Sequence, residues 1–441
     1  MNITPTGGST PAVIRVHDGL PGPQGPAGPS AYDLAVANGY TGTQTQWLDS
    51  LAVRGLRRRD LPHPAAAERL YSGTAPTISI AQTSTPTSGY IMHRPPGVTP
   101  GSGEEAAHLT LLGATNFQVG DTFPDTTYIL PTSRYPHTRD TYASSQSTWS
   151  LAFATDAADL QVRVNYQASG HYRLSIDGQP LTHTMTPLGG ATAGYTHLLS
   201  IDFGGAAHRT IRLDFSAVPF GGIYLPPGAT LWPAPPTGGR LAVLGDSLSD
   251  GSAENTGAGA GTWVHHTARQ LAAADTWNQS RGGTGYIASG TWANFPDRIT
   301  DITDHTPDRV IVWGGYNDSQ EDQAALAAAV DTTLAALTSA LPDAAIYVIG
   351  CWDPTGTPGA TITGTDTTLR GSAATAGIPF ISPITGSIYT ADGTLADTHG
   401  PWITTANQAA YIGSDNVHPN DDGHAYLARR ITAAIAALLP A

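Results

Sequence analysis

The pattern of apolar and polar positions divides most of the chain into two parts. Between residues 126 and 236, apolar residues recur at every second position in short runs, as at Leu160, Val162 and Val164. The runs at 172–176, 199–203 and 211–215 repeat this period, and Asp177-Gly178 is a hairpin-turn signal. Several such runs without a helical pattern predict an antiparallel β-sandwich over 126–236.

After a linker rich in proline and glycine at 233–239, the period changes. Leu241–Leu244 is a short apolar run, and similar runs lie at 309–315, 345–350 and within 378–384. Such runs predict buried strands. Apolar residues spaced by three and four predict helices over 262–274, 320–341 and 423–439. Because strands that alternate with helices form a parallel sheet covered on both faces, residues 237–441 are predicted to be an α/β domain.

Residues 61–125 show neither the period of two nor the helical period over more than a few residues. Threonine, serine, proline and glycine dominate there, and only Thr77–Ile80 and His108–Leu112 alternate like strands. We expect an irregular, strand-containing connector between the N-terminal part and the sandwich.

The N-terminal part has the features of a trimeric stalk. Residues 19–30 read GLPGPQGPAGPS, with glycine at every third position as in collagen, and a plain Pro/Gly linker is the alternative. Within 31–60, a capping box at Ser30–Asp33 and apolar residues at Trp47, Leu48 and Leu51 predict two short amphipathic helices. Since these helices are too small to bury a core alone, three copies around an axis, a homotrimer, are predicted.

From the glycine triplets to residue 51, the sequence resembles the collagen-like and trimerising modules of phage tail fibres and receptor-binding proteins. The resemblance implies a place in a virion, at the tail tip or fibre. Residues 1–18 would then be the segment that attaches to other phage tail proteins.

Charge and cysteine content narrow the function. The 441 residues carry 35 acidic and 21 basic side chains, which gives a net charge of −14. Because nucleic-acid binding needs a basic surface, this charge argues against a nucleic-acid-binding protein. Cys351 is the single cysteine, so we expect no disulfide within the chain and no cysteine metal site. No apolar run is long enough to span a membrane, and the N-terminus shows no signal peptide.

Polar clusters follow the predicted strands of the α/β domain, where parallel sheets place their ligands. Gly245-Asp246-Ser247 follows the first strand, residues 278–286 read NQSRGGTGY, residues 310–318 read VIVWGGYND, and residues 415–419 read DNVHP. A serine hydroxyl becomes a nucleophile when a histidine takes its proton. His418 is the candidate base, with Asp415 three residues before it to orient the ring, and His424 is its competitor.

These four blocks resemble, in order and spacing, the SGNH (GDSL-type) hydrolases over residues 240–441. The resemblance implies a three-layer, flavodoxin-like α/β fold and a serine esterase with the catalytic residues Ser247, His418 and Asp415. It requires no cofactor and no metal.

The resemblance also assigns an oxyanion hole. Its donors are the backbone N–H of Ser247, the backbone N–H of Gly283 and the side-chain amide of Asn317, with Gly282 and Gly285 as alternatives to Gly283. Many relatives carry Asp where this chain has Thr284. Asp246 and Asp318 are expected to fix loops rather than to react.

The predicted sandwich resembles, by its position before such a domain, the jelly-roll modules attached to some carbohydrate esterases. It could hold a glycan, with Trp149, Tyr166 or Tyr172 stacking on sugar rings if these side chains are exposed.

Together these features predict a phage tail-associated serine esterase. It would act extracellularly and hydrolyse acyl esters, acetyl by default, on a host cell-envelope glycan or glycolipid. The lysine-free composition, rich in alanine, glycine and threonine, suggests an actinobacterial host. One alternative is a receptor-binding tail spike that binds glycan without catalysis, and another is a bacterial surface esterase on a collagen-like stalk.

Overall fold

The computed structural model describes residues 36–37, 68–119, 126–133, 148–234 and 238–439. The predicted attachment segment and collagen-like triplets lie outside these residues, and so does the predicted helical segment apart from residues 36 and 37. Met1–Gly55 and Leu56–Ala441 are separate compact units, and the second is described below. Within the described ranges no helix is long and apolar enough to cross a membrane.

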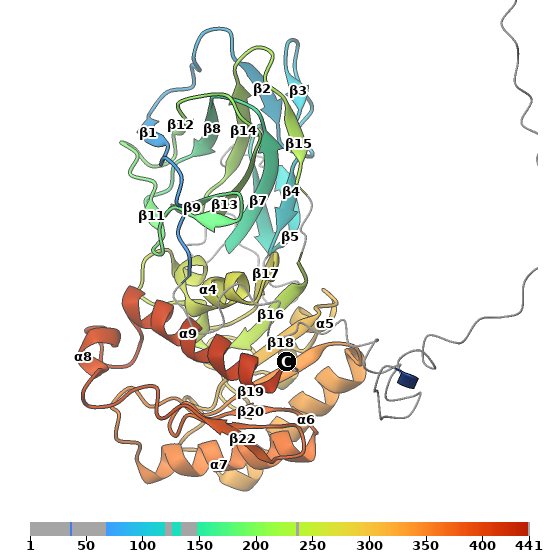
Figure 1. The fold of residues 1–441 in the computed structure, drawn as a ribbon, viewed down its shortest axis with the longest axis vertical. Helices are drawn as coiled ribbons and strands as arrows, with labels where there is room; N and C mark the ends of the chain where they lie inside the picture. Colours follow the sequence, from blue (N-terminus) through green and yellow to red (C-terminus); the bar gives the residue numbers. More distant parts are fainter. Residues whose placement is uncertain (1–35, 38–67, 120–125, 134–147, 235–237, 440–441) are drawn as a thin grey trace, which may run out of the picture. The chain divides into compact units, whose positions relative to one another are not determined.

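Two sheets form a β-sandwich in the first half of this unit (Figure 1). One has the order β1-β12-β8-β14-β2-β3, with β6 beside β14 and β5 beside β6; the other has the order β10-β9-β13-β7-β15, with β11 beside β9 and β4 beside β7. Their bounds are β1 Thr77–Ala81, β2 Ile91–Arg94, β3 Glu105–Ala106, β4 Thr110–Leu112, β5 Thr115–Val119, β6 Ile129–Ser133, β7 Thr148–Thr155, β8 Asp159–Asn165, β9 His171–Ile176, β10 Gln179–Pro180, β11 Thr186–Pro187, β12 Thr196–Asp202, β13 Arg209–Ser216, β14 Phe220–Leu225 and β15 Leu231–Pro233.

The period of two determines which side chains fill the sandwich. Leu160, Val162 and Val164 of β8 are fully buried and belong to one core with residues from both sheets. The predicted hairpin turn is present, because Asp177 and Gly178 both have positive φ, at 51° and 79°, between β9 and β10. The predicted β-rich region before the α/β domain is therefore confirmed.

Two of the predicted sugar-stacking residues are interior. Trp149 is 0% exposed and packs against Phe215 with ring centroids 5.1 Å apart, and Tyr172 is 7% exposed. The strand pattern shows that alternate residues share a face, but it does not show which aromatic side chains that face buries.

The predicted connector over 61–125 needs correction, because described residues within it belong to the sandwich. β1 pairs with β12, β2 with β14, and β4 with β7, so strands from this region enter both sheets. The partners lie far along the chain, as in the pairing of Ile80 with Leu199. Strands of two to five residues carry little period of their own, so their place depends on these distant partners.

The second half of the unit is built on a sheet of order β17-β16-β18-β19-β20-β21-β22. Neighbouring strands from β17 to β20 are parallel, and β21 and β22 extend the sheet in antiparallel pairs. The bounds are β16 Arg240–Gly245, β17 Asp275–Asn278, β18 Arg309–Trp313, β19 Ala345–Ile349, β20 Phe380–Ile381, β21 Ser387–Tyr389 and β22 Leu395–Thr398. The first strand in sequence, β16, lies between the second and the third, so the strand order reverses beside it, where such sheets bind ligands.

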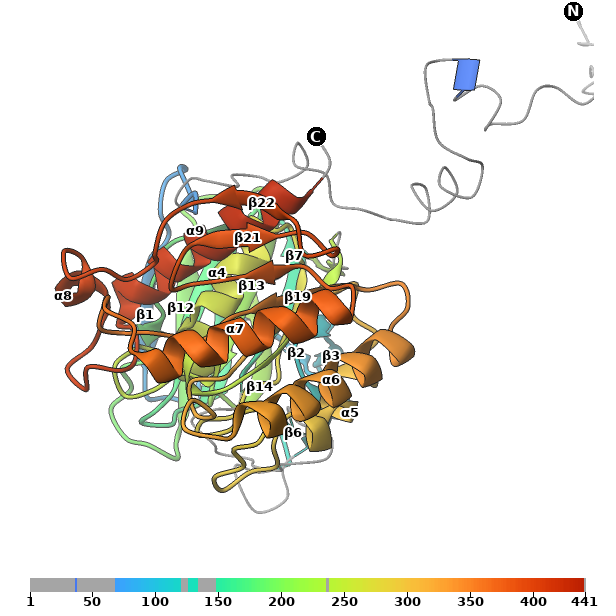
Figure 2. The same ribbon diagram turned by 90° about the horizontal axis from the view of Figure 1, so that it is seen from below.

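Helices cover both faces of this sheet (Figures 1 and 2). Leu241 and Val243 share a core with α4 (Trp263–Gln270) and α9 (Asp421–Leu438), whereas Ala242 and Leu244 share a core with α6 (Gln323–Ala340) and α7 (Ala360–Thr375). The shorter helices are α3 (Ser247–Asp250), α5 (Thr300–Thr303) and α8 (Gln408–Tyr411), with 3₁₀ turns η2 (Ala258–Gly261) and η3 (Pro296–Arg298). The predicted strands and helices of this domain are present with shifted ends, and α7 was not predicted.

A buried ionic network joins the sandwich to the α/β domain. Asp214 of β13 has no exposed side-chain surface and pairs with Arg173 at 3.2 Å and with Arg269 of α4 at 3.3 Å. Burial alone would raise the pKa of this carboxyl, but Arg212 and Arg173 hold it far below its ordinary value. Arg173 also donates to the Ala260 carbonyl at 3.0 Å. Because removing one partner would leave a buried charge unpaired, this network fixes the contact between the two domains.

Candidate active site

Ser247 stands at the junction of β16 and α3, where the strand order reverses. Asp246 has extended backbone (φ −103°, ψ −153°) and caps α3 by accepting from the Leu248 N–H at 2.9 Å. A Cβ at Gly245 would lie 2.6 Å from Ser249 Oγ and 2.8 Å from Ser280 Oγ, so a side chain has no room there. The glycine permits the sharp turn that presents Ser247 at the carboxyl edge of the sheet.

His418 and Asp415 lie on a hairpin-like loop just before α9. Ile412 and Pro419 form a bridge at its base, and Gly413 N–H donates to the His418 carbonyl at 2.8 Å. Trp352 Nε1 donates to the Val417 carbonyl at 3.0 Å and holds the loop against the end of β19. We call residues 412–419 the catalytic loop below.

Asp415 organises this loop with both carboxylate oxygens. Oδ1 accepts from the N–H groups of Val417 at 2.8 Å and His418 at 2.9 Å, and Oδ2 lies 2.5 Å from His418 Nδ1. Partial burial acts to raise the pKa of Asp415, but the hydrogen bonds from His418 and Val417 outweigh it and hold the pKa below its ordinary value. The carboxylate is therefore ionised and orients the imidazole.

The loop brings His418 to Ser247 across 171 residues of sequence. His418 Nε2 lies 2.8 Å from Ser247 Oγ, so a continuous chain of hydrogen bonds runs from Asp415 through His418 to the hydroxyl. The imidazole is 21% exposed and its carboxylate partner 35% exposed, which leaves the group open to a substrate. Such a chain can remove the hydroxyl proton as the oxygen attacks a carbonyl carbon.

His424, the competing histidine, is placed elsewhere. Its side chain is buried, and its Nδ1 accepts from the Trp263 N–H at 3.2 Å in the contact between α9 and α4. Burial lowers the pKa of His424 to about 3. Because its ring is enclosed, its Nδ1 is occupied and its basicity is low, His424 is not placed to take the proton of Ser247.

The glycine-rich turn after β17 lies beside Ser247, since a Cβ at Gly282 would be 3.6 Å from the Ser247 Cβ. The Gly282 N–H donates to Asp250 Oδ2 at 3.1 Å and is therefore occupied. Gly283 has φ +77°, a conformation that favours glycine, and within the described residues its N–H has no partner. Gly285 has no room for a side chain, because its Cβ would meet the Asp318 carboxylate. Of the three glycines, Gly283 has the available donor.

Asn317 follows β18 and faces the same turn. Its Nδ2 donates to the Thr284 carbonyl at 2.9 Å and lies 3.5 Å from Asp246 Oδ2. Asp318 is fully buried and accepts from the N–H groups of Tyr286, Ile287 and Ala288 at 2.8–2.9 Å. The expectation that Asp318 fixes a loop therefore agrees with its contacts.

A buried arginine supports the glycine-rich turn. Arg298 donates to the carbonyls of Gln279 at 2.7 Å and Gly245 at 3.3 Å, and to Thr284 Oγ1 at 3.0 Å. Thr284 Oγ1 donates in turn to the Arg281 carbonyl at 2.8 Å. Here the threonine hydroxyl links the arginine to the turn.

Asp246 has a different electrostatic position from Asp415. Burial raises its pKa to about 7, helped by the nearby negative charge of Asp318 and opposed by the hydrogen bond from Leu248 N–H. Its contacts are with Leu248 and Asn317, so it supports the serine turn and not the imidazole.

Comparison with known proteins agrees with this geometry. Residues 243–426, which include Ser247, Asn317 and His418, match the GDSL-like Lipase/Acylhydrolase family. A GDSL lipase of Mycobacterium tuberculosis is 32% identical over 202 residues, which cover 43% of this chain and 79% of the relative. The chain belongs to the GDSL-like lipase/acylhydrolase family. It is a GDSL-type esterase, as the four sequence blocks predicted.

The likeness of fold to a solved structure extends beyond the α/β domain. Salicylyl-acyltransferase SsfX3, from a tetracycline biosynthetic pathway, is 16% identical with a TM-score of 0.56, covering 75% of this chain and 95% of its own. Since the α/β domain is less than half of this chain, the shared fold includes the sandwich. A family two carbohydrate esterase from Clostridium thermocellum gives a TM-score of 0.49 at 15% identity, over 75% of this chain and 98% of its own.

Two contacts of the GDSL-type domain were not predicted from the sequence. After α3, Glu254 accepts from the Ser414 N–H at 2.7 Å and from its hydroxyl at 2.9 Å. Asp421 accepts from the Thr256 N–H and hydroxyl, both at 2.8 Å. The segment that follows the serine helix thus holds both ends of the catalytic loop. No local pattern marks these residues, because each contact spans 160 or more positions.

A cleft of about 360 Å³ is lined by Tyr316 and Ser319, which flank Asn317 in the sequence, and we call it the cleft beside Asn317. Its lining comes from the loops after β18 and β19 and from the start of α7: Tyr316, Ser319, Gln320, Asp353, Pro354, Thr355, Thr357, Gly359, Thr361 and Ile362. Hydroxyl, amide and carboxylate groups outnumber apolar side chains in this set. The described residues contain no group of His, Cys, Asp and Glu arranged to hold a metal ion.

Proposed function

We propose that Ser247 is the nucleophile, His418 the general base and acid, and Asp415 the residue that orients the imidazole. The hydrogen-bonded chain from Asp415 Oδ2 to Ser247 Oγ carries this proposal. The serine oxygen attacks the ester carbonyl while His418 Nε2 takes its proton. The imidazolium then protonates the departing alcohol, and a water activated by the same nitrogen releases the acid from the acyl-serine.

The tetrahedral intermediate needs donors for its oxyanion. We assign this role to the N–H groups of Ser247 and Gly283 and to Asn317 Nδ2. The turn that carries Gly283 is fixed by Arg298 and Asp318, so its donors are oriented before the substrate binds. Loss of one such donor typically costs about 3 kcal/mol of transition-state stabilisation.

The substrate we propose is an acyl ester, acetyl by default, on a glycan or glycolipid of a bacterial cell envelope. The polar lining of the cleft beside Asn317 supports a polyhydroxylated alcohol group there, because Asp353, Gln320 and the threonine hydroxyls can bond sugar hydroxyls. The mycobacterial relative is named a lipase, which supports a lipid-linked ester as the competing substrate. Its source also supports the proposal of an actinobacterial host.

For location we propose the tail of a phage, with the chain trimerised through residues 19–60 and attached through residues 1–18 to other tail proteins. The collagen-like triplets and the apolar pattern at 47–51 support this assembly. A non-catalytic spike is disfavoured, because a protein that only binds does not need the aligned Asp415–His418–Ser247 chain. Light scattering should give three chains per particle, and antibodies to the protein should label purified virions. A bacterial surface protein would give labelled cells instead.

The catalytic proposal is tested with Ser247→Ala. The variant should lose at least about 10⁴-fold in kcat/KM on 4-nitrophenyl acetate while its thermal unfolding stays unchanged. Ser339→Ala is the matched control, since Ser339 is an exposed serine of α6 on the other side of the sheet. Mass spectrometry of acid released from host envelope fractions identifies the acyl group. Turnover at the wild-type rate by Ser247→Ala would refute the assignment of Ser247 as the nucleophile.

A further inference from the structure

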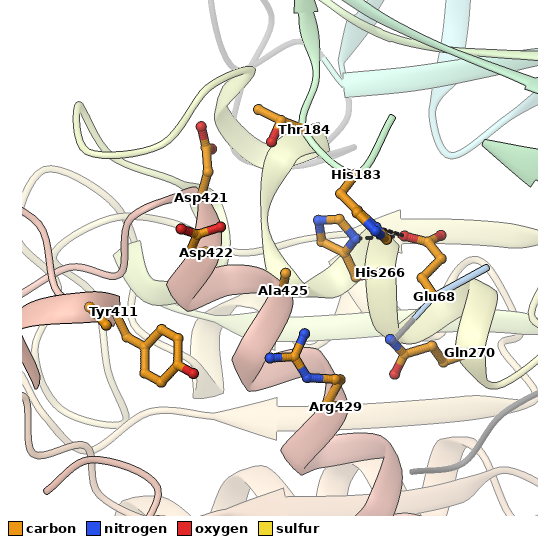
Figure 3. Close-up of a pocket in the computed structure, with 11 residues that line it drawn as sticks. Glu68, His183, Thr184, His266, Gln270, Tyr411, Asp421, Asp422, Ala425 and Arg429 are labelled. Atoms are coloured by element: carbon orange, nitrogen blue, oxygen red, sulfur yellow. Dashed lines mark hydrogen bonds and ion pairs between the residues drawn. The ribbon is translucent and has the colours of Figure 1, made fainter. Parts of the chain in front are cut away.

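A second cavity lies where the α/β domain meets the sandwich. It has a volume of about 340 Å³ and is bounded by α4, by α9, by Glu68 and by the segment His183–Thr184 that follows β10 (Figure 3). This size is at the lower end of the range for small-ligand sites. The cavity shares no lining residue with the cleft beside Asn317.

One wall of the cavity is a carboxylate that is already paired. Glu68 has 6% of its side chain exposed and is held by Arg269 of α4, by His266 Nδ1 at 3.0 Å and by His183 Nδ1 at 3.5 Å. Figure 3 shows His183, His266 and Glu68 converging at one end of the cavity. Because this carboxylate is already neutralised by its partners, it forms a rigid polar wall.

Gln270, which follows Arg269 on α4, has a buried side-chain oxygen without a hydrogen-bond partner in the described part of the chain. Gln270 is 4% exposed and lines the cavity, and its Oε1 has no hydrogen-bond partner within the described chain. That oxygen is itself enclosed by protein atoms, so Gln270 contributes to the cavity as a buried polar side chain of its wall.

The opposite wall is the N-terminal half of α9. Asp421 is engaged by Thr256, whereas Asp422 is exposed in the first turn and Arg429 lies two turns further along the same helix. Tyr411 closes one side and stacks on Tyr426, with ring centroids 4.2 Å apart and planes within 7°. The walls thus offer an acceptor, a donor and an aromatic side chain.

The balance of these groups selects an uncharged, hydroxyl-rich ligand. An anion would meet the exposed carboxylate of Asp422 as well as Arg429, and burial keeps His266 neutral by lowering its pKa well below the ordinary value. A metal ion is disfavoured because the described residues hold no cluster of metal-binding geometry. Sugar hydroxyls both donate and accept, which matches the amide, carboxylate and guanidinium that line the cavity.

The cavity also adjoins the catalytic loop. Tyr411 precedes the loop and Asp421 follows it, and the Asn420 N–H donates to the Tyr411 carbonyl at 3.0 Å to close the loop's base. A ligand in the cavity would therefore contact the residues on which the position of His418 depends.

We propose that this cavity is a second glycan-binding site, built by both domains, which holds one uncharged sugar unit of a polymer. It is separate from the catalytic serine and does not depend on the proposed acyl group. A polymer anchored here is retained near the active site between successive hydrolysis events.

The test compares small and polymeric substrates. The probes are O-acetylated gluco-, manno-, galacto- and arabino-oligosaccharides of one to six units, with 4-nitrophenyl acetate as the small ester. For at least one series, kcat/KM of the full-length protein should rise about tenfold with chain length. Gln270→Leu and Asp422→Ala should each remove most of this rise and leave 4-nitrophenyl acetate turnover unchanged. Asp331→Ala, an exposed acid on α6, is the control and should behave as wild type.

Binding is measured independently with the Ser247→Ala protein and the unacetylated hexasaccharides by calorimetry. Gln270→Leu in that background should weaken binding at least fivefold. The inference is overturned if no series shows a chain-length effect, if both variants retain it, or if inorganic phosphate occupies the site in place of sugar. If wild type fails to hydrolyse 4-nitrophenyl acetate, the esterase mechanism fails, while the calorimetry still decides the binding site.

Discussion

Glu254 provides a direct test of how the catalytic loop is held. Its carboxylate accepts from the Ser414 N–H at 2.7 Å and from the Ser414 hydroxyl at 2.9 and 3.1 Å. A Cβ at Gly413 would lie 2.3 Å from Glu254 Oε2, so the carboxylate is in direct contact with the loop. Ser414 is the residue immediately before Asp415. We predict that Glu254→Ala slows catalysis by loosening this loop.

The magnitude follows from the contacts. Two hydrogen bonds to a charged acceptor would be worth about 1.5–3 kcal/mol each if buried. Because this site is partly exposed, we take about 0.5–1 kcal/mol each, or about 1–2 kcal/mol together. If that free energy maintains the productive loop position, kcat falls by a factor of about 5–30.

The assay is steady-state hydrolysis of 4-nitrophenyl acetate, in which kcat should fall while KM changes little. Glu254→Gln retains an acceptor oxygen for the Ser414 N–H and should recover most of the activity, which a purely steric role would not predict. Glu105→Ala, an exposed acid of the sandwich strand β3, is the matched control. A Glu254→Ala enzyme with kcat within twofold of wild type would refute the reasoning.

Three further predictions concern buried or paired groups. In Asp415→Asn the amide oxygen should still accept from the two backbone N–H groups, which turns the amide NH₂ toward His418 Nδ1 and imposes the wrong tautomer on the imidazole. We expect kcat/KM to fall about 10⁴-fold. Activity within tenfold of wild type would contradict this. Burial lowers the pKa of His265 and of His424 to about 3, so below about pH 6.5 the unfolded chain binds more protons than the folded chain. The free energy of unfolding should therefore be highest above about pH 6.5 and fall as the pH drops. The expected slope is up to about 1.4 kcal/mol per pH unit for each histidine. Thermal unfolding from pH 7 to 4.5 measures this slope, which His265→Leu should flatten; an unchanged slope would count against the linkage. Asp318→Asn has one acceptor oxygen for three N–H groups and should lose about 1–3 kcal/mol in urea unfolding, whereas wild-type stability would show that the turn holds without the carboxylate.

Local sequence patterns determined the parts of this protein whose contacts are close in the chain. The run Leu241–Leu244 ending in Gly245-Asp246-Ser247 identified both a buried strand and the serine at its end. Asp415 and His418 are three residues apart, so their pairing in one loop could be predicted before the fold was known. The period of two likewise identified the long strands of the sandwich, because burial of one face is imposed at every second residue.

Patterns were less informative where a segment is short or poor in strong helix formers. The strands β1 to β5 have two to five residues and are stabilised by partners elsewhere in the sheets. Helix α7, with the sequence ATITGTDTTLRGSAAT, is rich in threonine and glycine, which have weak helix propensity. It is helical because Leu369 and Ala373 pack on the sheet beside α6, which is a tertiary effect.

Tertiary structure alone decided how the site is assembled. In the folded chain the Gly282 N–H donates to Asp250, which distinguishes Gly282 from Gly283. His424 is buried against α4, so it does not compete with His418. It also joined Glu254 to Ser414 and Gln270 to a cavity between two domains. Side-chain period reports which face of an element is buried, but the identity of a hydrogen-bond partner more than 100 residues away depends on how the chain packs in three dimensions.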